Sequence, residues 1–292
     1  MYPVLFTIFG FPVRSFGLMV VLGFLLGSHI YAKLGARYAK DPAQEAPGFA
    51  AVPIWVLVGI LLGARAMYVL VEVLQGSSTG QAYLADPLKI FAYWEGGLVM
   101  YGGTFGGVAA GLWCAKRHAM RLWHALDLGL ISGILGLAVG RVGCLLVGDD
   151  FGKVVPEAYK DLPFPITVKV PEVLPDQSLF GVENAGQVLW GTQPWMTLNA
   201  VALFFIGLWL MKRRRWEGQV AAQVLVLYSV GRFVIEMFRG DGIRGLWFND
   251  TVSTSQLVSI GLLIVCAAVL IKNRGRDDRN ALDLEALEKP GR

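Results

Sequence analysis

Charged side chains are scarce in this sequence, and their scarcity excludes an ordinary soluble domain. Only 16% of the 292 residues are charged, whereas about a quarter are charged in a typical globular protein. The hydrophobic residues make up 55% of the chain. They are gathered into runs long enough to cross the hydrocarbon core of a bilayer, which takes about 20 helical residues. The composition therefore predicts an all-α membrane protein.

Cysteine and histidine are also rare, with three of each. The cysteines Cys114, Cys144 and Cys266 lie in apolar runs and form neither a CxxC pair nor a cluster with histidine. The sequence therefore predicts no disulfide framework and no metal site, and we expect no cofactor. The formal net charge of +4 does not indicate nucleic-acid binding. Most of the basic residues lie just beyond the ends of the apolar runs, where membrane topology explains them.

Seven apolar runs are candidate transmembrane helices. They are 15–34, 49–73, 94–115, 123–146, 195–211, 217–238 and 255–271. The connection 147–194 is rich in proline and too polar to span, so we expect it to form a small cap outside the membrane, called here the cap segment. The charged tail 273–292 is expected to be disordered. Residues 1–292 are thus predicted to form a single membrane domain of about seven helices.

The distribution of lysine and arginine predicts the orientation of these helices. The connections on one side of the expected bundle, together with the tail, contain sixteen of these residues, and the connections on the other side contain seven. Cytoplasmic loops of membrane proteins carry the excess of positive charge. We therefore expect the N-terminus and the cap segment outside and the C-terminus in the cytoplasm.

Three arginines, Arg65, Arg141 and Arg232, remain inside the apolar runs. A charge at such a position is costly, and it is usually functional or paired. In the predicted orientation each arginine lies five to eight residues before the outer end of its helix. That spacing corresponds to a depth of roughly 8–12 Å at 1.5 Å per residue. The three side chains are therefore expected in one layer, level with the phosphates of outer-leaflet lipids.

Polar residues in the sixth run share one helix face. Tyr228, Arg232, Glu236 and Arg239 follow one another at spacings of four, four and three residues, which places them on one stripe. Two interpretations stay open. The pair Arg232–Glu236 could only hold helices together, or the arginines could converge on an anion. Because guanidinium groups bind phosphate bidentately and stay charged when desolvated, an anionic phospholipid is the natural ligand.

A series of motifs runs along nearly the whole chain. They are Gly10–Met19, Gly63–Arg65 with Tyr68, Trp94–Gly103, Asp127, Gly140–Gly152, Tyr228–Asp241 and Ser253–Gln256. In this order and spacing they resemble the prolipoprotein diacylglyceryl transferase family. Members of that family transfer diacylglycerol from phosphatidylglycerol to the lipobox cysteine thiol of a prolipoprotein, forming a thioether and releasing glycerol phosphate. The resemblance implies a multi-pass enzyme of the bacterial inner membrane with its active site toward the periplasmic leaflet. Its implied partners are phosphatidylglycerol, the signal peptide and lipobox of the precursor, and membrane lipids.

The resemblance also implies roles for individual residues. Arg141 and Arg232 would hold the lipid phosphate, with Glu236 fixing Arg232. Tyr101 and Asp149 stand where family members carry a proposed proton acceptor and a signature glutamate. The expected catalytic residues are Arg141, Arg232, Tyr101 and Asp149, and the expected substrate-binding residues are Arg141, Arg232, Arg65, Tyr228, Glu236, Arg239, Gly102 and Gly103. For the two glycines, helix packing is the simpler interpretation.

Several polar positions depart from the family pattern. Phe16 replaces a tyrosine, and Cys144 and Val147 replace asparagines. The segment Gln193–Asn199 resembles a family segment but lacks its histidine, tyrosine and glutamate. These departures leave the general base open. They also motivate an alternative function, that of a non-catalytic relative that binds anionic phospholipid or lipoprotein precursors. A third hypothesis, an anion transporter, predicts charges along both halves of the bilayer, which the sequence lacks.

Overall fold

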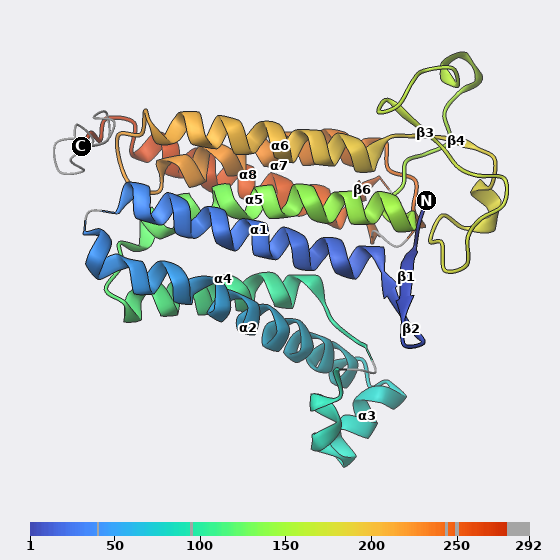
Figure 1. The fold of residues 1–292 in the computed structure, drawn as a ribbon, viewed down its shortest axis with the longest axis horizontal. Coiled ribbons are helices and arrows are strands. Elements are labelled where there is room, and N and C mark those ends of the chain that lie inside the picture. The colour runs from blue at the N-terminus through green and yellow to red at the C-terminus, as the bar shows by residue number, and fades with distance from the viewer. Residues whose placement is uncertain (40, 94–95, 243–244, 249–250, 279–292) are drawn as a thin grey trace. The chain divides into compact units, whose positions relative to one another are not determined.

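The computed structural model describes residues 1–39, 41–93, 96–242, 245–248 and 251–278, and it is mostly helical (Figure 1). The chain divides into two compact units, and each is described separately below. The first unit consists of Met1–Tyr31 together with the chain from Leu126 onward, and the second consists of Ala32–Ala125. The expectation of a single membrane domain stays a prediction. Most of the tail predicted to be disordered, 279–292, lies outside the described residues.

Within the described residues, six helices are long and apolar enough to cross a membrane. They are α1 (Ser15–Tyr38), α2 (Pro42–Leu74), α5 (Leu122–Val147), α6 (Thr192–Met211), α7 (Gln219–Met237) and α8 (Thr254–Lys272). Each overlaps one of the apolar runs, so the prediction of a helical membrane protein is confirmed.

The glycine-rich run 94–115 is not among these six candidate spans. Its helix, α4 (Met100–Arg117), has 18 residues and starts later than the run. Five glycines and the terminal pair Lys116 and Arg117 lower its hydropathy. Six of the seven predicted runs are therefore candidate spans, and the seventh span stays a prediction. Trp94 and Glu95, at the start of the run, lie outside the described residues.

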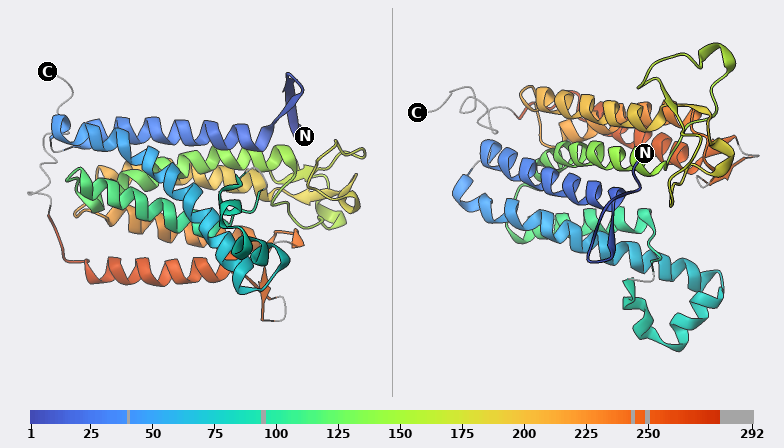
Figure 2. Two further views of the ribbon diagram at one scale, coloured as in Figure 1. Left: turned by 90° about the horizontal axis from the view of Figure 1, so that it is seen from below. Right: turned by 45° about the vertical axis from the view of Figure 1, so that its right-hand side comes forward.

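In the first unit α5, α6 and α7 lie side by side (Figures 1 and 2), and α7 also packs on α8. Helix α1 crosses α5 where Gly23 and Gly136 meet. A Cβ atom at Gly136 would lie 2.8 Å from the carbonyl oxygen of Gly23, so this close crossing requires glycine. The start of α1 lies beside the end of α5, because a Cβ atom at Gly143 would lie 3.3 Å from the Cα atom of Phe16.

Three short hairpins lie at this same end of the first unit (Figure 1). Strand β1 (Val4–Ile8) pairs with β2 (Phe11–Arg14), β3 (Thr167–Lys169) with β4 (Val188–Trp190), and β5 (Leu246–Trp247) with β6 (Val252–Ser253), all antiparallel. The cap segment, between α5 and α6, contains β3, β4 and two short 3-10 turns, η3 (Glu157–Tyr159) and η4 (Val182–Asn184). It has a small core of Val168, Val170, Phe180 and Leu189. The cap segment is therefore an ordered element, and its place outside the membrane stays a prediction.

A buried ion pair lies at the opposite end of the first unit. The carboxylate of Asp127 accepts hydrogen bonds from the backbone N–H groups of Gly218 at 2.9 Å and Ala221 at 2.7 Å, and so it caps the start of α7. The same carboxylate pairs with Arg214 at 3.3 Å, and the Arg214 side chain is only 2% exposed. Arg214 is one of the sixteen lysines and arginines from which the sequence analysis predicted the orientation. The structure shows that it also joins α5 to the start of α7.

The second unit is built on close packing of α2 against α4, with α3 (Ser78–Ala85) and η1 (Pro87–Phe91) in the connection between them. Gly59 and Gly63 of α2 meet Gly102 and Gly106 of α4. A Cβ atom at Gly106 would lie 2.9 Å from the Cα atom of Gly63. Small residues on both helices thus allow the backbones to approach. The glycine-rich run therefore packs helices.

Candidate functional site

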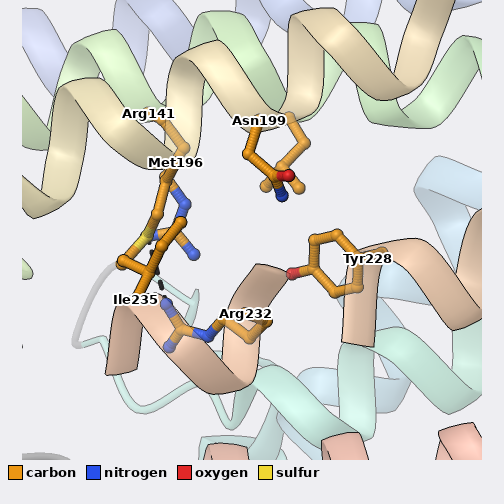
Figure 3. Close-up of a pocket in the computed structure, with 7 residues that line it drawn as sticks. Arg141, Met196, Asn199, Tyr228, Arg232 and Ile235 are labelled. Atoms are coloured by element: carbon orange, nitrogen blue, oxygen red, sulfur yellow. Dashed lines mark hydrogen bonds between the residues drawn. The ribbon is translucent and has the colours of Figure 1, made fainter. Parts of the chain in front are cut away.

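Arg141 from α5 and Arg232 from α7 line one small cavity in the first unit (Figure 3). The other residues that line it are Leu137, Met196, Asn199, Tyr228 and Ile235. Its volume is about 10 Å³, close to what a single water molecule needs. The cavity can therefore receive one oxygen atom of a ligand. Both guanidinium side chains border the same cavity, so an anion between them would be stabilised.

Tyr228 presents its hydroxyl to the interior of this cavity, between Asn199 and Arg232 (Figure 3). One helical turn separates Tyr228 from Arg232 on α7, and side chains at this spacing share a helix face. Asn199, from α6, supplies an amide group that can donate as well as accept a hydrogen bond. The cavity thus combines two cations and two neutral polar side chains with the apolar side chains of Leu137, Met196 and Ile235.

The side chain of Arg232 is held by three neighbours. Its Nη2 atom donates to the Glu236 carboxylate at 2.9 Å and to the Ser255 hydroxyl at 3.0 Å, and its Nη1 atom contacts the Met196 sulfur at 3.1 Å. Arg232 is 9% exposed and Glu236 is 1% exposed. The ion pair considered in the sequence analysis is therefore present, and it leaves the guanidinium at the edge of the cavity.

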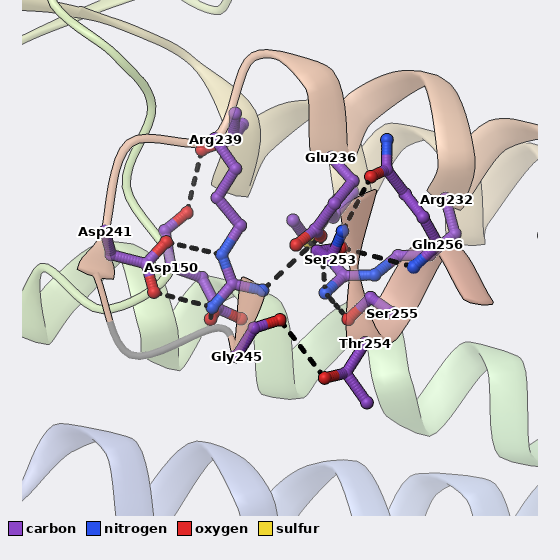
Figure 4. A network of polar contacts seen from close by, with 12 residues as sticks. Asp150, Arg232, Glu236, Arg239, Asp241, Gly245, Ser253, Thr254, Ser255 and Gln256 are labelled. Carbon is purple, nitrogen blue, oxygen red and sulfur yellow. Dashed lines mark hydrogen bonds and ion pairs between the residues drawn. The ribbon is translucent and has the colours of Figure 1, made fainter. Parts of the chain in front are cut away.

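Arg239 lies at the centre of a carboxylate cluster (Figure 4). Its Nε and Nη2 atoms donate to the two oxygens of Asp241 at 2.5 and 2.7 Å. Its Nη1 atom lies 3.5 Å from Glu236, and its Nη2 atom also contacts Asp150. Burial by itself would lower the pKa of Arg239, but its hydrogen bonds to Asp241 and the charges of the surrounding carboxylates raise the pKa above its ordinary value.

Asp150 bridges two arginines from different elements. One carboxylate oxygen contacts Nη1 of Arg141, and the other contacts Nη2 of Arg239. Burial alone would raise the pKa of this carboxyl group, but the two guanidinium groups lower it below its usual range. The sequence analysis did not select Asp150. The available signal was a second carboxylate directly after the helix that carries Arg141.

Asp149 has the opposite electrostatic environment. It is half-buried, and its carboxylate accepts a hydrogen bond from the backbone N–H of Asp150 at 2.9 Å. Burial and the neighbouring charge of Asp150 raise the pKa of Asp149 above its ordinary value. Adjacent carboxyl groups with pKa values moved apart are suited to different roles in proton transfer. Within the described residues, no three or more of His, Cys, Asp and Glu form a group that could hold a metal ion.

Arg65 belongs to the second unit and is bound there by the backbone. Its guanidinium donates to carbonyl oxygens of Ile90 at 2.7 Å, Lys89 at 2.9 Å and Gly96 at 2.6 Å. The rings that surround it are Tyr68, Tyr83 and Tyr93, with centroids 5.7, 5.3 and 5.7 Å away. With 1% exposure, Arg65 anchors the connection between α2 and α4. Its role in anion binding stays a prediction.

The predicted site residues divide between the two units. The structure brings together Arg141, Asp149, Tyr228, Arg232, Glu236 and Arg239 in the first unit. Tyr101, Gly102 and Gly103 lie with Arg65 in the second unit. Tyr101 is half-buried in the first turn of α4. Gly102 and Gly103 are buried against α2, and a Cβ atom at Gly102 would collide with the carbonyl oxygen of Gly63.

Comparisons with known proteins identify the family of this chain. The sequence profile of the family described as prolipoprotein diacylglyceryl transferase matches residues 3–272. A Clostridium perfringens protein named phosphatidylglycerol–prolipoprotein diacylglyceryl transferase 2 is 29% identical over 265 residues, which cover 89% of this chain and 91% of the relative. Proteins named phosphatidylglycerol–prolipoprotein diacylglyceryl transferase from Pasteurella multocida and Gloeobacter violaceus are 28% and 29% identical, and each alignment covers 92% of this chain and 91% of the relative. The chain belongs to the prolipoprotein diacylglyceryl transferase family.

Proposed function

We propose that this protein transfers the diacylglyceryl group of phosphatidylglycerol to the lipobox cysteine thiol of a prolipoprotein. The family match and the names of the relatives support this activity. The observation that carries it is the cavity at which Arg141 and Arg232 meet from separate helices. A phosphate oxygen placed there receives charge-assisted hydrogen bonds from two planar guanidinium groups.

The chemistry needs a nucleophile and a stabilised leaving group. The thiolate of the precursor attacks the glycerol carbon that carries the phosphate ester. The C–S bond forms as the C–O bond breaks, and the electron pair leaves with glycerol phosphate. Negative charge grows on the departing phosphate, so Arg141 and Arg232 stabilise the transition state more than the ground state.

The thiol must also lose its proton, because the thiolate is the reactive form. Asp149 is the first candidate for the base, since its raised pKa brings it closer to the operating pH. Tyr101, in the second unit, is the other candidate by family resemblance. In this mechanism Glu236 orients Arg232, while Tyr228 bonds the phosphate or the glycerol through its hydroxyl.

The proposed setting is the bacterial inner membrane, with seven spans and the site toward the periplasmic leaflet. Helix α4 would supply the seventh span, since its 18 residues reach about 27 Å at 1.5 Å per residue. The excess of lysine and arginine on one side supports a cytoplasmic C-terminus. The cap segment and the Arg239 cluster then lie on the periplasmic side, where secreted precursors present their signal peptide and lipobox.

A direct assay tests the activity. The purified protein in proteoliposomes containing phosphatidylglycerol is given a lipobox peptide, and released glycerol phosphate is measured together with the lipidated peptide. We expect both products in equal amounts. If neither forms while the Clostridium perfringens relative is active under the same conditions, the transferase assignment is wrong.

One observation favours a second function, that of a non-catalytic lipid-binding relative. The neutral Asn199 lines the cavity at a position where the resemblance leads us to expect a glutamate. On this alternative the protein binds phosphatidylglycerol in the proteoliposomes but releases no glycerol phosphate. Product formation by the unmodified protein excludes it.

A further inference from the structure

The charged residues beside the cavity form one continuous alternating series, which we call the charge chain: Arg232, Glu236, Arg239, Asp150 and Arg141. Each carboxylate in it contacts two guanidinium groups. Figure 4 shows the part of the charge chain that runs from Arg232 through Glu236 and Arg239 to Asp150. The two ends of the charge chain line the cavity, and its central residue does not. The position of one cavity arginine is therefore linked to the position of the other through the residues between them.

The centre of the charge chain is already saturated by carboxylates. Arg239 is paired with Asp241, Glu236 and Asp150, and it is 7% exposed. A guanidinium surrounded in this way has little capacity left for a lipid phosphate. Arg239, which the sequence analysis placed among the substrate-binding residues, is better suited to holding the two carboxylates in place.

Asp150 is fixed by its own backbone. Its φ angle is +55°, a left-handed conformation that Asp and Asn tolerate better than most residues. The hydroxyl of Thr192 donates to the Asp150 carbonyl at 2.8 Å, and the amide of Gln193 donates to the Asp149 carbonyl at 2.9 Å. The start of α6 thus holds the turn that aims the Asp150 carboxylate at Arg141.

Arg141 depends on this one carboxylate. Within the described residues, the carboxylate in contact with Arg141 is that of Asp150. Without that negative charge, Arg141 loses the carboxylate that it contacts, and nothing in this pair holds its guanidinium at the cavity. The carboxylate of the adjacent Asp149 accepts a hydrogen bond from the backbone N–H of Asp150 instead.

We propose that Asp150 is a positioning residue for the transfer reaction: it holds Arg141 at the cavity edge, with Arg239 as its second anchor, and so sets the geometry in which the phosphate is bound. This inference rests on the proposed function. It assigns the alignment of the phosphate-binding arginines to a residue that does not itself touch the lipid.

The test begins with Asp150→Asn, which keeps the side-chain shape and the backbone preference but removes the charge. Misplacement of a catalytic group by about 1 Å can cost about 10²-fold in rate, so we expect kcat to fall by about that factor. Thermal unfolding in detergent should still be cooperative. Asp150→Glu, which restores the charge, should recover part of the loss. The matched control is Asp161→Asn, the same chemical change at an exposed position of the cap segment, and it should keep the full rate.

A double-substitution cycle separates positioning from a general structural effect. If Asp150 acts through Arg141, adding Asp150→Asn to Arg141→Lys should cost little beyond the loss from Arg141→Lys alone. If the fold losses in rate from the two single variants multiply fully in the double variant, the proposal is wrong. A full rate in Asp150→Asn would also overturn it.

If Asp150→Asn fails to fold, the variant Thr192→Val tests the proposal in its place. Loss of its one hydrogen bond to the turn should lower kcat by about threefold to tenfold, and an unchanged rate overturns the proposal.

Binding of the lipid distinguishes this inference from the proposed function. If the unmodified protein releases no glycerol phosphate, the transferase assignment fails. Binding of dioleoylphosphatidylglycerol, measured by native mass spectrometry on the full chain, then tests Asp150 separately. We expect at least tenfold weaker binding in Asp150→Asn than in the unmodified protein and in Asp161→Asn. Equal binding in all three proteins overturns the inference.

Discussion

At the residue scale, the site depends on the difference between a planar guanidinium and a point charge. The guanidinium of Arg141 must contact Asp150 and line the cavity at the same time. The guanidinium of Arg232 must contact Glu236 and Ser255 and also line the cavity. A guanidinium presents five N–H donors in a fixed plane and can satisfy several partners. A lysine ammonium is a compact, more strongly hydrated charge that fits such forked contacts poorly.

Lysine substitutions test this requirement. Arg141→Lys and Arg232→Lys are each expected to lower kcat by about 10²-fold, the usual effect of removing a donor that stabilises transition-state charge. The measurement is glycerol phosphate release in proteoliposomes. Arg215→Lys, at an exposed position away from the cavity, serves as the control and should retain its rate. Near-normal rates and unchanged lipid affinity in both cavity variants would show that the arginines do not clamp the phosphate.

The adjacent carboxyl groups of Asp149 and Asp150 lead us to expect a transfer rate that depends on pH. The pKa of Asp149 is raised by burial and by the charge of Asp150. A base must be unprotonated, so the rate should fall as the pH drops through this raised pKa, at a pH above the ordinary aspartate value of about 3.9. We expect Asp149→Asn to lower kcat and to remove this acidic limb from the pH profile. A variant that keeps the limb would exclude Asp149 as the base.

At the element scale, hydropathy was enough to predict most helices, since α1, α2, α5, α6, α7 and α8 each overlap an apolar run. The start of α4 was not predictable from hydropathy. Gly96 and Gly97 have φ angles of +82° and +76°, which no right-handed helix accommodates, so the helix begins only at Met100.

The candidate site likewise combines features that the sequence predicts with features that it does not. Helical periodicity was sufficient to place Tyr228, Arg232 and Glu236 on one face of α7. The role of Asp150 depends on a left-handed backbone conformation in a turn and on α6, which is distant in sequence. Neither feature leaves a periodic pattern. The anchoring of Arg65 by backbone carbonyls was equally hidden, because those carbonyls carry no residue-specific signal.

Packing of α2 on α4 gives a stability prediction. In Gly106→Ala the new methyl group would lie 2.9 Å from the Cα atom of Gly63, and overpacking of this kind costs about 1–3 kcal/mol. The midpoint of thermal unfolding in detergent should therefore fall. Gly133→Ala on α5, where a Cβ atom meets nothing within 4 Å, should leave the midpoint unchanged or raise it. A midpoint in Gly106→Ala that is no lower than in Gly133→Ala would contradict the packing account.

At the scale of the whole molecule, the first unit has polar clusters at both ends. The charge chain lies where α5 and α7 end, next to the cap segment, and the buried pair Asp127–Arg214 lies where these two helices begin. The helices between them are apolar. Such a distribution suits a protein that crosses a membrane and performs its chemistry near one face.

The orientation can be tested with single cysteines in intact cells. The three natural cysteines are buried, so introduced thiols can be labelled selectively. Asp161→Cys in the cap segment should react with a membrane-impermeant maleimide added from the periplasmic side. Arg215→Cys should react only after the membrane is permeabilised. The reverse pattern would place the cap segment in the cytoplasm and exclude the proposed site of reaction.

The most direct test of the central claim is an experimental structure of the protein with phosphatidylglycerol bound. The account predicts the lipid phosphate within hydrogen-bond distance of the guanidinium groups of both Arg141 and Arg232, with Asp150 and Glu236 still paired to them. A phosphate bound elsewhere, with both of these guanidinium groups turned away from it, would contradict the account.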